Sequence, residues 1–268
     1  NLPVDPAAPR ATMATFLIPA DAKGFSVGRV ERKCGQKASQ TAELFFNDIF
    51  VPEENMWEPP GRGLRHTREI LSITRGYIGM AGVGLARGAL ERCLAYAAGK
   101  KVRGHRLIDE EWVQFIFADT LKDIAAARNA CYNFAVALDT RHAWQLFEAP
   151  PVKLSLNLLP GRLLLSEPVA ALAGTPFLDR AGTYLKNRLV SDETVEAFVA
   201  HGSAVKVTGT DLAVKTASRM LDIVGLEGMD HRCGLEKCFR DAKITQIYEG
   251  SNQANRIDLF NFEIGRFL

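Results

Sequence analysis

Near its C-terminal end the chain reads Arg240-Asp241-Ala242-Lys243-Ile244-Thr245-Gln246-Ile247-Tyr248-Glu249-Gly250-Ser251-Asn252-Gln253. Helical spacing runs from about Glu236 to Phe262, and the Glu249-Gly250-Ser251 segment interrupts it, because glycine and serine favour a turn over a helix interior. The carboxylate of Glu249 can therefore project from a helix end, where it could serve as a general base. From these residues alone, an ordinary exposed glutamate is the commoner alternative, since charged side chains usually lie in water.

Three long segments before this stretch have helical periodicity. Apolar residues recur at three- and four-residue steps from about Thr67 to Ala98, from about Asp109 to Leu138 and from Asp192 to about Val224. Asp109 is the expected N-cap of the second helix. A loop is expected at residues 225–234. Small residues crowd one section of the first helix, where we expect another backbone to approach closely: Gly79, Ala81, Gly82, Gly84 and Ala86.

The first 60 residues have the pattern of short strands rather than helices. The runs Ala14–Ile18, Ala42–Phe46 and Ile49–Val51 are rich in β-branched and aromatic residues and are bounded by proline or by an Asn-Asp pair. The predicted fold class is α+β. A partial β-barrel or sheet (residues 1–60) precedes an antiparallel helical domain (residues 61–268), which carries a proline-interrupted insertion at about 141–190.

Composition narrows the functional classes. The 268 residues are 47% hydrophobic and 24% charged, with a net charge of +2 and no long basic run, so nothing indicates nucleic acid or a membrane surface. Five cysteines at irregular spacings favour a reducing compartment, and the predicted location is cytoplasmic. His231, Cys233 and Cys238 lack the spacing of a four-ligand set, so no metal site is predicted. Because the chain opens at Asn1 inside what reads as a sheet region, an N-terminal portion is expected to be missing.

The stretch at 240–253 closely resembles the C-terminal signature of the acyl-CoA dehydrogenases, R-D-A-K-I-x-Q-I-Y-E-G-T-x-Q, and departs from it mainly at Ser251. Other segments resemble the same family in the right order: Lys23–Ser26, Gly35–Ser39, Phe46–Asn55, Thr74-Arg75, Gly82–Ala86 and Ala89-Leu90. The resemblance covers roughly residues 12–140 and 195–262. It lacks the family's N-terminal helical domain and the first half of its β-domain.

The resemblance implies FAD-dependent dehydrogenation of an acyl-CoA thioester to the 2,3-enoyl-CoA. Glu249 would remove the α-proton while a hydride passes to flavin N5, and the backbone N–H of Glu249 would help to polarise the thioester carbonyl. Tyr248 and Gly250 would lie against the substrate, and Ser251 and Gln253 would contact the flavin nucleotide. Electrons would pass to an electron-transfer flavoprotein; oxygen, as in acyl-CoA oxidases, is the alternative acceptor.

Two neighbouring residues on the first long helix bear on the assignment of the base. Some members of the resembled family place the base just before a helix arginine, and here that position is Thr74, which cannot act as a base. Glu249 is therefore the only candidate. The arginine itself, Arg75, matches a family arginine near the CoA end of the site, and a buried arginine that ties two helices together is an equally good interpretation.

The chain departs from the resembled family where a neighbouring subunit grips the flavin nucleotide. The family's R-x-x-F-G reads Lys100-Lys101-Val102-Arg103-Gly104, and Glu111 stands at a later glutamine position. Its Q-x-x-G-G-x-G becomes Asp222-Ile223-Val224-Gly225-Leu226-Glu227-Gly228. Added carboxylates oppose a diphosphate, so this grip is predicted to be unused. We therefore expect a hetero-oligomer with a related subunit. A homo-oligomer is the alternative, as is a non-catalytic partner subunit, against which Glu249 argues.

Overall fold

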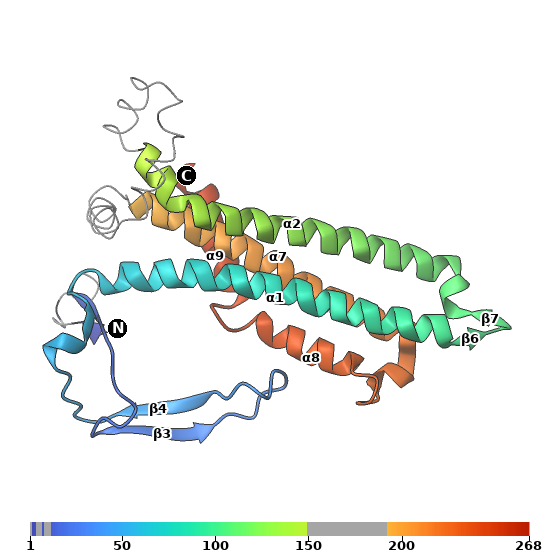
Figure 1. The fold of residues 1–268 in the computed structure, drawn as a ribbon, viewed down its shortest axis with the longest axis horizontal. Helices are drawn as coiled ribbons and strands as arrows, with labels where there is room; N and C mark the ends of the chain where they lie inside the picture. The colour runs from blue at the N-terminus through green and yellow to red at the C-terminus, as the bar shows by residue number, and fades with distance from the viewer. Residues whose placement is uncertain (1, 4–6, 8–11, 149–191, 268) are drawn as a thin grey trace, which may run out of the picture.

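The computed structural model in Figure 1 describes residues 2–3, 7, 12–148 and 192–267. Its five helices in these ranges are α1 (Gly63–Gly99), α2 (Glu111–Glu148), α7 (Asp192–Val224), α8 (Leu235–Thr245) and α9 (Asn252–Glu263). Short 3-10 turns lie at Glu53–Asn55, Leu107–Asp109, Gly225–Met229 and Gly265–Phe267. The strands are β1 (Leu2–Pro3), β2 (Met13–Phe16), β3 (Phe25–Val30), β4 (Ala42–Phe46), β5 (Met56–Glu58), β6 (Lys101–Val102) and β7 (His105–Arg106).

The helices α1 and α7 lie side by side and run in the same direction (Figure 1). Glycines make this close approach possible. A Cβ added at Gly79 would lie 2.7 Å from the carbonyl oxygen of Val205, and one at Gly82 would lie 2.5 Å from that of Gly209. The predicted backbone contact at the small residues of α1 is thus present at Gly79 and Gly82. Gly84 takes no part in it, because a Cβ there would meet nothing within 4 Å.

The hydrophobic core lies between α1, α2 and α7. Leu90 and Cys93 of α1, Val113 of α2 and Met220 of α7 are all buried in it. The α2 helix returns antiparallel to α1, and α8 packs against α1 (Figure 1). Burial of these apolar faces removes them from water and is the main source of stability for the bundle. None of the described helices has the length and hydropathy required to cross a bilayer.

The strands form three small antiparallel sheets in the described ranges: β1-β2-β5, β3-β4 and β6-β7. The hairpin of β3 and β4 pairs Phe25 with Phe46 and lies beside the helices (Figure 1). Its connection docks on α8, where Gly35 is required because a Cβ would lie 2.2 Å from the carbonyl oxygen of Arg240. The guanidinium of Arg240 donates to the carbonyl of Cys34 at 2.7 Å. This connection brings the β-part close to the 240–253 stretch.

The predicted α+β class is confirmed, with a small β-part followed by a helical bundle. The α7 helix spans the predicted range of residues 192–224, and β4 spans the predicted range of residues 42–46. The α1 helix begins at Gly63, four residues before its predicted start. The division into domains at residue 60 stays a prediction.

Three local expectations were wrong, and strands outside the expected runs were missed. Ile49–Val51 is not a strand, because Asp48 adopts φ 48° and Pro52 follows. The β3 strand was missed, since Gly28 weakens its pattern. Asp109 does not cap α2; it lies in a 3-10 turn, and its carboxylate accepts from Arg106. The α2 helix continues to Glu148, beyond the expected end at 138. Most of the expected insertion at 141–190 lies outside the described residues.

Candidate active site

The segment between α8 and α9 is a turn in which two consecutive residues adopt left-handed backbone. Glu249 has φ 56° and Gly250 has φ 81°. Glycine adopts this conformation freely, whereas for a glutamate it is an uncommon conformation that surrounding contacts must maintain. The N–H of Asn252 closes the turn by donating to the carbonyl of Gln246 at 2.9 Å. The turn that interrupts the helical pattern was therefore correctly predicted.

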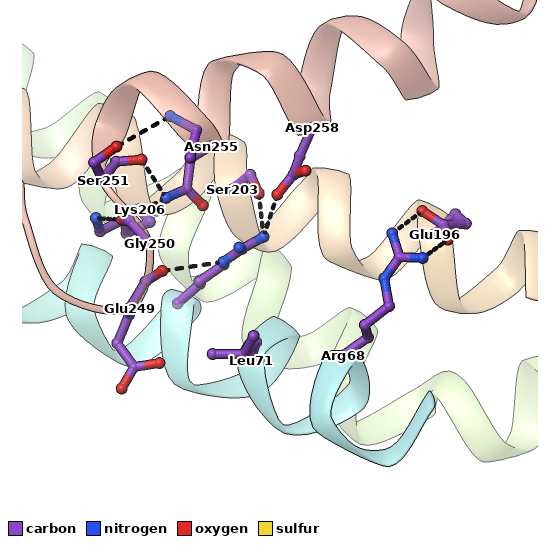
Figure 2. A network of polar contacts seen from close by, with 12 residues as sticks. Arg68, Leu71, Glu196, Ser203, Lys206, Glu249, Gly250, Ser251, Asn255 and Asp258 are labelled. Carbon is purple, nitrogen blue, oxygen red and sulfur yellow. Dashed lines mark hydrogen bonds and ion pairs between the residues drawn. The ribbon is translucent and has the colours of Figure 1, made fainter. Parts of the chain in front are cut away.

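The carboxylate of Glu249 is half-buried and bonded to the first long helix. Thr74 Oγ1 of α1 donates to Glu249 Oε2 at 2.7 Å, although the two residues are 175 positions apart in the chain. Figure 2 shows this carboxylate pointing away from the polar network that holds the turn's backbone. The structure thus brings together Glu249 and Thr74, the two positions that the sequence analysis considered for a base. Glu249 has the carboxyl group and Thr74 has a hydroxyl.

The backbone carbonyls of the same turn face a group of donors on three helices (Figure 2). Arg75 Nε of α1 donates to the carbonyl of Glu249 at 3.3 Å. Lys206 Nζ of α7 donates to the carbonyl of Gly250, which also accepts from Asn255 Nδ2 of α9 at 2.7 Å. Asn255 Nδ2 lies 2.9 Å from the carbonyl of Ser251 as well. Side chains from α1, α7 and α9 therefore converge on three successive carbonyl groups.

Arg75 is one of the two buried cations of this network, with 6% of its surface exposed. Its Nη1 donates to Ser203 Oγ of α7 at 2.8 Å and pairs with Asp258 of α9 at 2.9 Å. These contacts connect α1 to α7 and α9, as expected of an arginine that ties helices together. A contact between Arg75 and a substrate stays a prediction.

Lys206 is the second buried cation, and sequence reasoning missed it. It has 0% exposure and is the largest fully buried side chain in the described part of the protein. Burial lowers the pKa of Lys206 to about 8, a shift that nearby Arg75 reinforces and the carboxylates of Glu249 and Asp211 oppose. The available signal was a lysine in the apolar stripe of α7, next to the buried Val205.

Tyr248 is positioned from the β-part of the chain. Gln36 Nε2 donates to the Tyr248 hydroxyl at 3.2 Å, and the Gln36 backbone N–H donates to Asp241 Oδ1 at 2.6 Å. Gln36 itself adopts φ 46°, a backbone conformation that is uncommon for residues other than glycine. Sequence reasoning gave Gln36 no role of its own, because the contact joins residues 212 positions apart.

The predicted flavin contacts lie at the start of α9. Ser251 is the N-cap of this helix, and its Oγ accepts from the N–H of Ala254 at 3.2 Å. Gln253 lies in the first turn with its side chain exposed. A helix N-terminus presents N–H groups and a partial positive charge to an anion. The roles of Ser251 and Gln253 toward a nucleotide stay predictions.

Comparison with known proteins decides what this arrangement belongs to. Residues 61–156 and 181–261 match the model of the family described as "Acyl-CoA dehydrogenase, C-terminal domain". The chain belongs to the acyl-CoA dehydrogenase family.

Individual relatives agree with this assignment. The probable acyl-CoA dehydrogenase FadE25 of Mycobacterium tuberculosis is 29% identical over 245 residues, which cover 91% of the chain and 49% of that protein. The structure of butyryl-CoA dehydrogenase from Megasphaera elsdenii superposes with a TM-score of 0.71 at 25% identity, covering 96% of this chain and 53% of that one. A structure titled for the electron transferring flavoprotein of Acidaminococcus fermentans gives 0.72 at 25% identity, covering 97% and 55%. The chain spans about half the length of the curated relatives it matches.

The positions expected to grip a flavin diphosphate lie at the opposite end of the bundle from the N-termini of α1 and α7. Lys100, just after α1, forms an ion pair with Glu227 of the 225–229 turn. Its ammonium lies 5.6 Å from the centroid of the Tyr96 ring. Asp222 is exposed, and Leu226 is 92% exposed. The ammonium of Lys100 in this acyl-CoA dehydrogenase chain is therefore already paired with a carboxylate, which weakens its attraction for an anionic diphosphate.

Proposed function

We propose that this chain is the part of an FAD-dependent acyl-CoA dehydrogenase that contains the catalytic base, Glu249. The observation that carries the proposal is the turn at 249–250. Its left-handed backbone directs the carbonyls toward the bundle and the carboxylate toward Thr74 on α1. A base must be held in one orientation to contribute fully to proton abstraction, and this turn meets that requirement.

The residues of the chain have distinct tasks in the proposed reaction. The carboxylate of Glu249 takes the α-proton of the acyl thioester, and the Thr74 hydroxyl orients that carboxylate through the 2.7 Å hydrogen bond. The backbone N–H of Glu249 donates to the thioester oxygen, which stabilises the charge that develops there. Tyr248, held by Gln36, and Gly250 border the substrate. When bound, FAD supplies the hydride acceptor at its N5 position, and the product is a 2,3-enoyl-CoA.

Two regions of the chain fit FAD differently. Near Glu249, the N-terminus of α9 with Ser251 and Gln253 suits contact with a nucleotide. At Lys100 and Glu227 the charges neutralise each other and do not suit one. We therefore propose a hetero-oligomer in which a related subunit supplies the diphosphate contacts and this chain supplies Glu249. A homo-oligomer is the alternative, and a partner subunit without catalysis would not require the base.

Electrons are proposed to leave through an electron-transfer flavoprotein. Two findings support this choice. The chain belongs to the acyl-CoA dehydrogenase family, and it is similar to a structure titled for an electron transferring flavoprotein. Direct reoxidation by oxygen, as in acyl-CoA oxidases, is the other candidate. Consumption of oxygen during turnover, measured with and without an artificial electron acceptor, distinguishes the two.

Replacing Glu249 with glutamine tests the proposed base. Glu249→Gln removes the proton acceptor and leaves the shape of the side chain, so turnover on an acyl-CoA should fall by about 100-fold or more. Flavin content, measured by visible absorbance, should be unchanged. The matched control is Glu91→Gln, which neutralises an exposed glutamate of α1 that pairs with Arg87. Turnover of Glu249→Gln close to that of the wild type would exclude Glu249 as the base.

A further inference from the structure

Lys206 has an environment that a merely structural lysine does not require. Its side chain is fully buried, and its ammonium donates to a neutral acceptor, the carbonyl of Gly250. Burying an ammonium is costly unless close partners compensate for the lost water. A methionine of similar length at this core position would avoid that cost. The lysine is thus best explained by what its charge does to the segment it contacts.

The segment that Lys206 contacts is the turn that carries Glu249. Arg75 and Lys206 donate to the carbonyls of two successive residues, Glu249 and Gly250, from two different helices. Both of these residues have left-handed backbone. A left-handed glutamate is less stable than one in an ordinary backbone conformation, so the turn needs contacts that outweigh this cost. Hydrogen bonds from charged donors are roughly twice as strong as neutral ones.

The charged groups that act on Lys206 lie on α1, on α7 and on the turn itself. Arg75 faces it from α1, Asp211 lies on the same α7 helix, and Glu249 is on the turn itself. Asn255 of α9 supplies a neutral donor to the same carbonyl at 2.7 Å. Since Gly250 already has this neutral donor, the distinct contribution of Lys206 is its positive charge at the base of the turn (Figure 2).

We propose that Lys206 is a positioning residue for Glu249, because its ammonium holds the carbonyl of Gly250 and thereby keeps the Glu249 carboxylate directed at Thr74 and the substrate. The expected effect of Lys206 on catalysis rests on the proposed function, in which Glu249 is the base. The hydrogen bond from Lys206 to the carbonyl of Gly250 is a property of the structure, and its effect on the turn can be measured without turnover.

The test compares Lys206→Met with wild type in the purified, flavin-containing protein. Hydrogen exchange of the peptide covering residues 246–255 should become at least tenfold faster, while that of residues 235–245 in α8 stays within twofold. Turnover on an acyl-CoA should fall about 10- to 100-fold with KM within threefold, since the substrate still binds but the base is poorly aimed. Lys215→Met is the matched control, because Lys215 lies on the same helix but is exposed and pairs with Asp123.

A second variant, Lys206→Gln, keeps an N–H donor without the charge and decides the question if Lys206→Met does not fold by circular dichroism. Its exchange and turnover should lie between those of wild type and Lys206→Met. Unchanged exchange at 246–255 in a folded variant would overturn the proposal, as would an equal increase throughout α7 and α8. A wild-type protein inactive on acyl-CoA substrates would defeat the proposed function, whereas the exchange comparison would still decide whether Lys206 holds the turn.

Discussion

Thr74 illustrates at the residue scale how a side chain that cannot act as a base can still assist one. Its hydroxyl lies 2.7 Å from the Glu249 carboxylate and also 3.3 Å from the carbonyl of Leu71. A single hydroxyl hydrogen can serve one of these acceptors at a time, and the shorter distance favours the carboxylate. Thr74 thus restricts the orientation of Glu249, the proposed base.

Thr74→Ala should therefore have a mild effect, a decrease in turnover of about two- to tenfold, corresponding to loss of one modest hydrogen bond. Steady-state kinetics at saturating acyl-CoA measure it. Thr74→Ser, which retains the hydroxyl, should recover most of the activity. A loss as large as that of Glu249→Gln would contradict the placement of the base on the 249–250 turn.

The lowered pKa of Lys206 also predicts how the free energy of unfolding depends on pH. Its folded-state pKa of about 8 lies below the ordinary 10.5, so the folded state binds fewer protons than the unfolded state between these values. Wild-type stability should therefore rise with pH across this window relative to Lys206→Met, by up to roughly 3 kcal/mol at about 1.4 kcal/mol per pKa unit. Denaturant unfolding at pH 7.5, 9 and 10 measures the difference. A difference that stays constant, or falls with rising pH, would show that folding does not lower the pKa of Lys206.

At the scale of elements, the contact between α1 and α7 sets the geometry of the site. Arg75 and Lys206 lie on these two helices, and both donate to the 249–250 turn. A Cβ added at Gly209 would lie only 2.1 Å from the carbonyl oxygen of Gly79, so the two backbones nearly touch. Any widening of this contact changes the distance between the two cations and the turn.

Gly79→Ala should accordingly lower the free energy of unfolding by about 1–3 kcal/mol, because the new methyl group collides with the backbone carbonyl of Val205 as well as with the Val205 side chain, and the backbone cannot move aside without shifting α7. It should also lower turnover. Gly84→Ala is a matched control on the same helix, where a Cβ meets nothing within 4 Å and alanine should stabilise by about 0.5–1 kcal/mol through helix propensity. Chemical denaturation separates the two. If Gly79→Ala and Gly84→Ala changed the free energy of unfolding equally, α1 and α7 could move apart without loss of stability.

At the scale of the whole molecule, the exposed apolar residues and the neutralised Lys100 support assembly with another chain. Phe45, Phe46 and Trp57 of the β-part are about half-exposed, and Leu226 is almost entirely so. Large apolar side chains exposed in this way are candidates for contact with another chain or with another part of the same protein. Meanwhile, the Lys100–Glu227 pair leaves this chain poorly suited to hold a diphosphate itself.

We expect the chain expressed alone to carry little FAD, and the chain purified with a related subunit to carry it. Native mass determination and visible absorbance measure composition and flavin content. In the chain expressed alone, the combined substitution Asp222→Gln, Leu226→Gly and Glu227→Asn should raise flavin content, because it removes two carboxylates and a bulky side chain. A complex of identical wild-type chains with one FAD each would contradict the hetero-oligomer.

The sequence by itself determined the features that depend on neighbours along the chain. The long helices follow from apolar periodicity, and the turn at 249–251 follows from its glycine and serine. The proposal of Glu249 as the base came from the family resemblance of the motif around it. Even there, local signals failed where a nearby residue competed, as when Arg106 took the carboxylate of Asp109 away from the α2 terminus.

Only the tertiary structure decided which residues support Glu249. Thr74 is 175 positions away from it, Gln36 is 212 positions from its partner Tyr248, and Lys206 is 44 positions from Gly250. Periodicity indicates that residue 206 lies on a buried stripe, but it does not indicate that a carbonyl group will meet a lysine there. The physical reason is that the partners of a buried charge are chosen by how helices pack. In this protein that packing follows from the close approach of α1 and α7 at their glycines.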